Sequence, residues 1–164
     1  MQNKLLILGA GQYGLLVREI AISMNCFSKI DFLDDIATVA IGKISDYEVF
    51  SKSYSHAVVA IGDPNLREEL FLNLKSTPLV LTSIISPLAY VSNSATIGAG
   101  VVVEPMAVIQ SGVVVGDGVI VSSGAVLRHN SVVENFCHCD CNSVISSNSV
   151  VSKGFKVEKL TLFR

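Results

Sequence analysis

Apolar residues recur at every sixth position through the second half of the chain. From Val91 to Val157, eleven of the twelve residues reached by steps of six are Ile, Leu or Val, and the twelfth is Cys139. Those three types make up 26 of the 80 residues from 85 to 164, so chance would place about four of them at twelve positions. A single repeat cannot bury its apolar side chain alone and must stack on its neighbours. The pattern therefore predicts a solenoid, a fold of stacked coils.

A second apolar column lies one residue before the first. Its members are Val or Ile, namely Val102, Val108, Val114, Ile120, Val126, Val132, Val144 and Val150. Side chains alternate between the two faces of a strand, so this column points outward if the first points inward. Large exposed apolar patches are uncommon on monomers. The second column therefore predicts a homo-oligomer.

The first half of the chain has a different composition. Residues 1–84 hold 12 Leu and 6 Val, whereas residues 85–164 hold 4 Leu and 17 Val. Leu favours helices and Val favours strands, so we expect a mixed α/β domain over 1–84 and an all-β domain over 85–164. In the first domain, alternating elements indicate a parallel sheet. We expect strands at 4–8, 29–33, 57–61 and 79–82, and helices at 15–23, 47–51 and 65–74.

A glycine-rich turn follows the first expected strand. Gly9, Gly11 and Gly14 form a Gly-x-Gly-x-x-Gly pattern that opens a helix, and such turns cradle phosphate groups. Asp34 and Asp35 follow the second strand about 20 residues later, where dinucleotide-binding folds place a ribose-binding acid. A complete fold of that type has about six strands, and this half of the chain supplies three or four. The pattern argues against NAD and for a mononucleotide half; a tight turn without a ligand is the alternative.

Charge and hydropathy exclude several classes of protein. The net charge of −2 implies no basic surface for nucleic acid. The longest unbroken run of apolar or glycine residues is seven, whereas a membrane helix needs about 18. We expect no membrane association, no signal peptide and, because three of the four cysteines fall within residues 137–141, no disulfide framework. The expected location is cytoplasmic.

Several segments together resemble a known family. The hexads 97–102 and 115–120, the turn 9–14 and the segments 32–35 and 57–63 resemble the sialic acid O-acetyltransferase and nucleotide-amino-sugar N-acetyltransferase family of hexapeptide-repeat acyltransferases. This resemblance implies a half-Rossmann domain followed by a left-handed parallel β-helix, three hexads to a triangular coil, and a homotrimer. It also implies transfer of an acetyl group from acetyl-CoA to an amino or hydroxyl group of a sugar or nucleotide sugar, with no metal.

The resemblance places a UDP-sugar or a related substrate in the first domain. In this family the glycine-rich loop takes the pyrophosphate, and an acidic residue after the second strand meets the uracil or ribose. Gln12 and Tyr13 replace a Gly-His pair that is often found in the loop, which leaves the sugar open. The implied substrate-binding residues are Gly9, Gly11, Gln12, Tyr13, Gly14, Asp34, Asp35 and Gly62.

His129 is the candidate general base. It stands two residues after an inward position, where the other hexads carry small or turn-forming residues, so we expect it at a corner. The family's base matches this position, and a histidine suits proton transfer because its ordinary pKa lies near neutrality. Asn130 follows it where relatives often carry a carboxylate, so Glu134 or Asp140 is the expected source of negative charge. A solvated corner histidine is the alternative.

His138 and Ser122 are the candidate acyl-donor contacts. His138 interrupts the outward apolar column, and a polar ring there is expected to have a partner. The resemblance places a histidine at this position near the acetyl group, in a cleft that a neighbouring subunit can complete. Ser122 stands where relatives often carry Asn. A polar subunit contact is the alternative for His138.

Other interpretations of the same residues stay open. Cys137, Cys139 and Cys141 invite a metal site, but three residues along one strand suit tetrahedral ligation poorly, so we expect buried core cysteines. The sequence ends at Arg164, about two coils beyond His129. A non-catalytic nucleotide-sugar-binding trimer, with a β-helix too short for CoA, is therefore the main alternative function. A small NAD(P)-binding regulator is a third.

Overall fold

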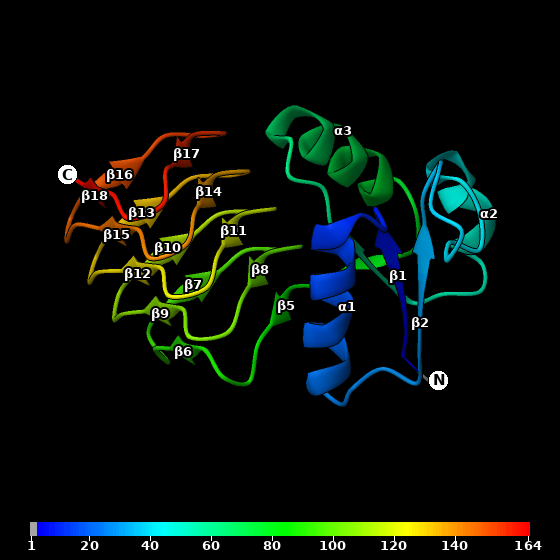
Figure 1. The fold of residues 1–164 in the computed structure, drawn as a ribbon, viewed down its shortest axis with the longest axis horizontal. Coiled ribbons are helices and arrows are strands. Elements are labelled where there is room, and N and C mark those ends of the chain that lie inside the picture. Colours follow the sequence, from blue (N-terminus) through cyan, green and yellow to red (C-terminus); the bar gives the residue numbers. More distant parts are fainter. Residues whose placement is uncertain (1–2) are drawn as a thin grey trace.

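The N-terminal part of the molecule is built on a parallel four-stranded sheet (Figure 1). The computed structural model describes residues 3–164. The sheet has the order β2-β1-β3-β4. Its strands are β1 (Lys4–Leu8), β2 (Lys29–Leu33), β3 (His56–Val59) and β4 (Val80–Leu81). Leu5 to Leu8 are fully buried, as expected for a parallel sheet with both faces covered.

Helices connect these strands in the order that the sequence predicts. They are α1 (Gln12–Ser23), the short 3₁₀ helix η1 (Ile44–Asp46), α2 (Tyr47–Phe50) and α3 (Pro64–Lys75). Helix α1 begins three residues earlier than expected, because Gly11 already serves as its N-cap. Helix α3 begins after Asp63, whose side chain accepts a hydrogen bond from the backbone N–H of Leu66. No helix within residues 3–164 has both the length and the apolar character of a membrane span.

The second part is a parallel β-helix made of two-residue strands. Strands that are three apart in order pair with each other, so partners are 18 residues apart, as in Val102↔Ile120. Three sheets result, which we call the domain-side sheet (β5, β8, β11, β14, β17), the outer sheet (β6, β9, β12, β15, β18) and the third sheet (β7, β10, β13, β16). The strands are β5 (Ile84–Ile85), β6 (Tyr90–Val91), β7 (Thr96–Ile97), β8 (Val102–Val103), β9 (Val108–Ile109), β10 (Val114–Val115), β11 (Ile120–Val121), β12 (Val126–Leu127), β13 (Val132–Val133), β14 (His138–Cys139), β15 (Val144–Ile145), β16 (Val150–Val151), β17 (Lys156–Val157) and β18 (Leu162–Phe163).

The predicted inward column forms the core of the β-helix. All ten of its members from Val103 to Val157 are buried in one cluster, and Val91 and Ile97 pack against that cluster. The small residues between them, such as Ala107 and Ala125, are also fully buried. The six-residue period therefore predicted both the fold and its core.

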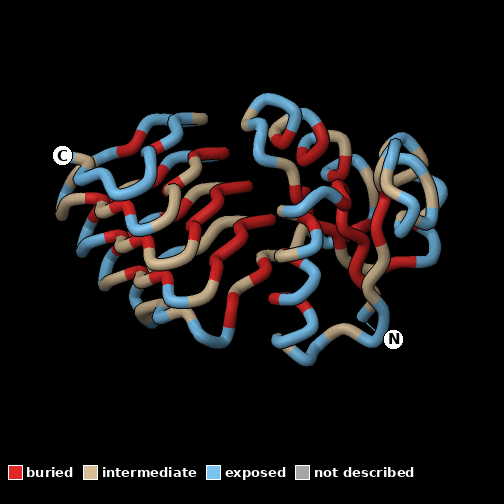
Figure 2. The backbone as a smooth tube through the Cα atoms, viewed as in Figure 1, coloured by how far each residue is buried: buried red, intermediate tan, exposed pale blue. Residues whose placement is uncertain are grey.

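The outward column meets two different environments. Val102 and Ile120 lie on the domain-side sheet and are buried, and Val102 packs in one cluster with residues of β1 and α1. Figures 1 and 2 show α1 and α3 lying along this sheet, where the tube is mostly red. Val114 and Val150 on the third sheet remain about half exposed. The N-terminal part of the same chain therefore buries Val102 and Ile120 on the domain-side sheet. The outward apolar residues of the other two sheets stay partly exposed.

Candidate functional site

The glycine-rich turn, Gly9–Gly14, is the first part of the candidate site, and we call it the phosphate loop. Gly9 has a φ of +104°, and an added Cβ there would lie 2.7 Å from the carbonyl oxygen of Ala60. A Cβ on Gly14 would collide with the carbonyl of Gly9. A Cβ added to Gly11, in contrast, would meet nothing within 4 Å. Gly9 and Gly14 therefore shape the turn, and Gly11 faces open space at the N-terminus of α1, which favours anions.

Asp34 holds the backbone of the phosphate loop through a hydrogen bond. Its carboxylate accepts hydrogen bonds from the backbone N–H groups of Ala10 (2.8 Å), Ile36 (2.9 Å) and Ala37 (2.8 Å). These bonds, with that from Ala10 the largest contribution, hold the pKa of Asp34 below its usual value. Asp35 accepts a bond from the N–H of Ile44 at 3.1 Å. Asp34 therefore stabilises the backbone of the loop and of the turn after β2, a structural role that its position in the motif did not predict.

The two residues in the middle of the loop differ in exposure. Gln12 is exposed and available to a ligand. The hydroxyl of Tyr13 is buried and has no hydrogen-bond partner among residues 3–164. Burial, and after it the negative charge of Glu104, raises the pKa of Tyr13 well above its usual value. The tyrosine therefore stays neutral and points into the interior of the molecule.

A buried arginine holds the turn at residues 61–62, which lies beside Gly9 of the phosphate loop. Arg67 in α3 is 1% exposed and donates to four backbone carbonyls. Two belong to Ile61 (2.9 Å) and Gly62 (2.7 Å), in the turn before α3. The other two, of Gly118 (2.8 Å) and Phe136 (2.6 Å), lie on successive coils of the β-helix. An added Cβ on Gly62 would meet nothing within 4 Å, so this turn, like Gly11, borders open space. No sequence motif singled out Arg67, which lies among other charged residues of its helix.

His129 lies at a corner, as predicted. It follows β12 and precedes β13, so it lies where the outer and third sheets meet. Its backbone N–H donates to Gln110 Oε1 (3.1 Å), and its Nδ1 lies 3.3 Å from Ser147 Oγ. The other ring nitrogen makes no hydrogen bond within the described residues. If Nδ1 donates to the serine, Nε2 is left unprotonated and able to accept a proton.

The expected partners of His129 lie elsewhere. The amide oxygen of Asn130 points at Gly112 on the coil below, where an added Cβ would collide with it. Glu134 accepts a bond from the backbone N–H of Lys153 at 2.8 Å, one corner further along the coil. Within the described residues no hydrogen bond joins Asn130, Glu134 or Asp140 to the ring of His129, so their catalytic roles stay predictions, and Ser147 is the ring's partner within one chain. Ser147 follows His129 by 18 residues, one full coil, and that spacing could have revealed it.

The structure brings Ser122 and His138 together. His138 Nε2 lies 3.0 Å from Ser122 Oγ, so the polar ring in the outward column has a hydrogen-bond partner, as expected, although the sequence did not say which residue it would be. Ser122 also donates to the carboxylate of Glu104 (3.2 Å), a residue that no sequence pattern had marked. His138 lies on the domain-side sheet, the same sheet along which α1 and α3 pack (Figure 1).

The candidate residues thus form two separate groups in one chain. The phosphate loop and His138 lie on the domain side of the β-helix. His129 lies at the corner opposite that sheet, on the side away from α1 and α3 (Figure 1). A single chain therefore does not bring the candidate base to the phosphate loop.

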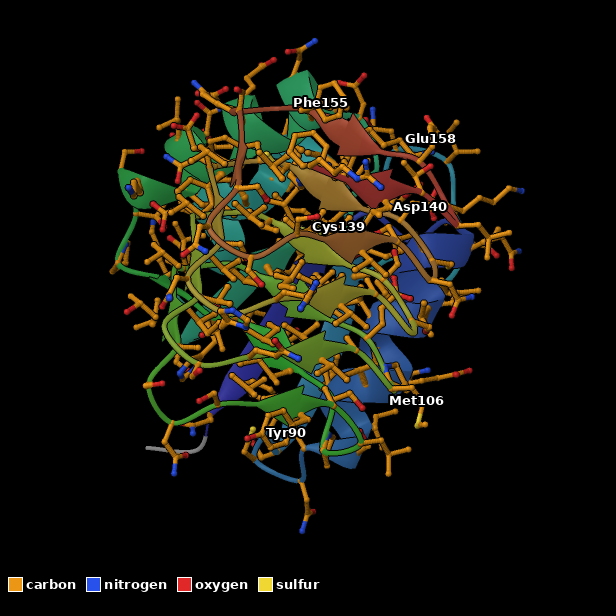
Figure 3. The ribbon with its side chains drawn as sticks, turned by 90° about the vertical axis from the view of Figure 1, so that its left-hand side faces the viewer. Tyr90, Met106, Cys139, Asp140, Phe155 and Glu158 are labelled. Atoms are coloured by element: carbon orange, nitrogen blue, oxygen red, sulfur yellow. The ribbon has the colours of Figure 1, made fainter. Side chains whose placement is uncertain are left out.

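Two further features lie outside these groups. Cys137 and Cys139 are buried in the core, as expected, whereas Cys141 is half-buried at a turn (Figure 3 labels Cys139). No cluster of three metal-ligating side chains occurs in the described part of the chain. A groove of about 390 Å³ runs between α1 and a β-helix corner, lined mainly by apolar residues such as Leu16, Pro87 and Pro105. It lacks the histidines that acyl transfer chemistry would use.

Comparisons with known proteins agree with this architecture. Residues 4–74 match the PglD N-terminal domain, and residues 94–129 match the bacterial transferase hexapeptide (six repeats). No curated protein sequence matched the chain. A half-Rossmann domain joined to a left-handed β-helix defines a hexapeptide-repeat acyltransferase fold.

Solved structures extend the similarity to nearly the whole chain. The acetyltransferase domain of PglB from Neisseria gonorrhoeae FA1090, in complex with acetyl coenzyme A, is 30% identical with a TM-score of 0.85, over 98% of this chain and 85% of that one. A mutant of perosamine N-acetyltransferase from Caulobacter crescentus, in complex with CoA and GDP-perosamine, is 25% identical with a TM-score of 0.88, over 94% of this chain and 76% of that one. WeeI from Acinetobacter baumannii AYE shares the fold at 17% identity and a TM-score of 0.68, over 99% and 97%. The chain belongs to the family of sialic acid O-acetyltransferases and nucleotide-amino-sugar N-acetyltransferases.

Proposed function

We propose that this protein transfers an acetyl group from acetyl-CoA to an amino or hydroxyl group of a nucleotide sugar. The observation that carries this proposal is the 30% identity, over 98% of the chain, to an acetyltransferase domain solved with acetyl coenzyme A. A second similar protein holds a nucleotide sugar together with CoA. A screen of acyl-CoAs and nucleotide sugars by thermal shift tests the binding part, because ligands of the native state raise its melting temperature.

The phosphate loop is the proposed site of the nucleotide diphosphate. Gly11 and Gly62 border open space on two sides of it, and the N-terminus of the 12-residue helix α1 offers free N–H groups and a partial positive charge. Asp34 keeps the loop in shape, and Asp35 and Gln12 are the proposed nucleotide contacts. A UDP-sugar or a related nucleotide sugar fits this chemistry.

His129 is the proposed general base. Its imidazole takes the proton from the attacking amino or hydroxyl group as that atom bonds to the carbonyl carbon of the thioester. The carbon–sulfur bond breaks, and the CoA sulfur leaves and takes up a proton. The acetyl group thereby moves directly from sulfur to nitrogen or oxygen, and no covalent bond to the protein forms. Ser147 orients the ring through the 3.3 Å contact to Nδ1.

A second copy of the chain is needed to complete this proposed site. The phosphate loop packs on the domain side, and His129 lies at the opposite corner, so His129 of one copy has to meet the loop of another. The outer and third sheets supply the surface, with apolar outward residues that the N-terminal part leaves uncovered. These are Val108, Val126 and Val144 on the outer sheet, and Val114, Val132 and Val150 on the third sheet. We infer a homotrimer packed through these sheets.

Charged substitutions in these sheets are expected to break the trimer. Val132→Lys or Val144→Lys places an ammonium group in the middle of an apolar contact, where burying an unpaired charge is strongly unfavourable. We expect light scattering to report monomers or aggregates for either variant and trimers for the wild type. Ile36→Lys is the matched control, because Ile36 is 93% exposed in the N-terminal part. A monomeric wild-type protein at micromolar concentration would contradict the trimer.

Substitution of Gly11 is expected to block nucleotide-sugar binding without unfolding the protein. The φ of Gly11 is −69°, which valine tolerates, and the added side chain would project into the space proposed for the pyrophosphate. Calorimetry on Gly11→Val should show loss of nucleotide-sugar binding at an unchanged melting temperature. Gly14→Ala is the control for a purely structural glycine, because its Cβ collides with the carbonyl of Gly9 and should lower the melting temperature. Unchanged affinity in folded Gly11→Val would remove the loop from the site.

A further inference from the structure

A buried carboxylate lies behind His138. Glu104 is 5% exposed at the end of β8, and its Oε1 accepts a hydrogen bond from Ser122 Oγ (3.2 Å). Its Oε2 accepts two bonds from Ser123, from the backbone N–H (2.9 Å) and from Oγ (3.0 Å). Ser122 Oγ in turn lies 3.0 Å from His138 Nε2. A continuous chain of hydrogen bonds therefore runs from Glu104 to the ring.

The number of protons in this chain fixes the direction of each bond. A backbone N–H can only donate, and a carboxylate that receives three hydrogen bonds acts only as an acceptor. Ser122 has a single hydroxyl proton, and the bond to Glu104 uses it. The serine oxygen can then only accept from His138, so Nε2 must carry the ring proton. A neutral ring has one such proton, which leaves Nδ1 unprotonated.

Within residues 3–164, no charged group replaces Ser122 as the partner of Nε2. Asp140 Oδ1 lies 4.0 Å from that nitrogen, too far for a hydrogen bond, and accepts instead from the N–H of Cys141 at 2.7 Å. Asp140 Oδ2 pairs with Lys156 Nζ at 3.0 Å. Figure 3 shows Asp140 on the same edge of the β-helix as Glu158, which also pairs with Lys156.

The ring of His138 is neutral at ordinary pH. Burial, the largest influence, lowers its pKa below the usual value. Asp140 and Glu158 act in the opposite direction, and Lys156 and Arg67 reinforce the decrease. The ring is therefore in its neutral form with the proton on Nε2.

We propose that Glu104 is a positioning residue, which through Ser122 holds His138 as the Nε2–H tautomer and so presents an unprotonated Nδ1 to the acceptor sugar. This inference rests on the proposed function. It assigns His138 a specific role, because an unprotonated nitrogen accepts a hydrogen bond from the acceptor sugar and cannot donate one to the thioester oxygen. The donor is the second N–H of an attacking amino group, or a hydroxyl group beside the attacking atom, since His129 takes the other proton. His138 is then a contact of the acceptor, whereas the family resemblance implied a contact of the acetyl donor.

Glu104→Gln is the sharpest test, because it keeps the shape of the side chain and reverses one bond. Ser123 holds one oxygen of the carboxylate with two donors, so the new NH₂ group should take the position that faces Ser122. It would donate to Ser122 Oγ, the serine proton would turn to His138, and the ring proton would move to Nδ1. We expect kcat to decrease by roughly 10–10²-fold, since a wrong histidine tautomer disables the ring, while the KM for acetyl-CoA stays unchanged.

The tautomer can be read without any substrate. Two-bond ¹H–¹⁵N spectra distinguish protonated from unprotonated ring nitrogens, and the chain has only three histidines. The His138 signals are those absent from His138→Gln. We expect protonated Nε2 in the wild type and protonated Nδ1 in Glu104→Gln. Ser122→Ala should abolish the preference even if Glu104→Gln folds poorly. Ser123→Ala removes a bond of similar length from the same carboxylate and should change neither the tautomer nor kcat.

Each result decides between the inference and the proposed function. Protonated Nδ1 in the wild type, or the same tautomer and kcat in wild type and Glu104→Gln, overturns the role of Glu104 even if the protein is an active acetyltransferase. A wild type that transfers no acetyl group overturns the role of His138 toward the acceptor together with the proposed function, and the tautomer measurement still judges the contact with Glu104. The expected tautomers together with the kcat loss support the whole inference.

Discussion

Replacing His129 with alanine is expected to lower the turnover of acetyl transfer by about 10²–10⁴-fold, the usual contribution of a positioned general base. The methyl group of alanine cannot take the proton of the attacking nitrogen or oxygen. The affinity for acetyl-CoA should change little, because the base acts on the acceptor. The folded structure should persist, since His129 is exposed and its only side-chain bond within the described residues is the 3.3 Å contact to Ser147. Steady-state kinetics and a thermal melt measure both quantities.

Mixed trimers give this prediction a control that tests the second copy as well. His129→Ala lacks the proposed base and Gly11→Val lacks the proposed loop, so each homotrimer should be inactive. In a trimer that contains both chains, one of the three contacts joins an intact His129 to an intact loop of the neighbouring copy. Co-expression of the two variants should therefore restore activity. If co-expressed, verified mixed trimers remain as inactive as the parents, the site does not lie between copies.

The second large effect is expected on stability. Arg67→Met keeps an unbranched side chain of similar length but removes all four hydrogen bonds to carbonyls, including those of Gly118 and Phe136 in the β-helix. Buried acceptors left without partners cost about 1–3 kcal/mol each, so the free energy of unfolding should decrease by about 3 kcal/mol or more. Since these bonds join α3 to two coils, the loss should also loosen the N-terminal part from the β-helix. Urea unfolding followed by circular dichroism measures it.

Two exposed lysines provide matched controls for Arg67. Lys75 pairs with Asp117 at 3.4 Å, and Lys153 pairs with Glu68 at 2.6 Å, across the same junction. Both lysine side chains are about half exposed, so each alanine substitution should cost less than about 1 kcal/mol. A loss for Arg67→Met no larger than for these lysines would show that the junction does not depend on the buried guanidinium.

The sequence predicted the β-helix better than the contacts between its parts. A strict six-residue period leaves one arrangement for the core, and the inward column from Val103 to Val157 is buried throughout. The outward column repeats equally on all three faces, so its sequence does not distinguish the face that α1 covers. Val102 and Ile120 are buried because they lie on the face that the N-terminal part covers, whereas Val114 is exposed on another face.

The sequence predicted where the candidate residues lie in the repeat, but it did not predict their hydrogen-bond partners. The corner position of His129 and the polar partner of His138 follow from departures from the repeat. Their actual partners, Ser147 and Ser122, come from neighbouring coils, and a spacing near 18 residues identifies them only once the coil length is known. Glu104 occupies an ordinary corner position and becomes notable only when its three hydrogen bonds are seen.

Direct measurement of acetyl transfer tests the central claim. The purified protein is mixed with acetyl-CoA and a panel of nucleotide sugars that carry free amino or hydroxyl groups, and free CoA thiol and product mass are followed together. We predict that at least one nucleotide sugar gains a single acetyl group, with one CoA thiol released for each acetyl group transferred and with loss of the reaction in His129→Ala. Binding of nucleotide sugars without binding of any acyl-CoA, and without transfer, would contradict the claim and identify a nucleotide-sugar-binding protein instead.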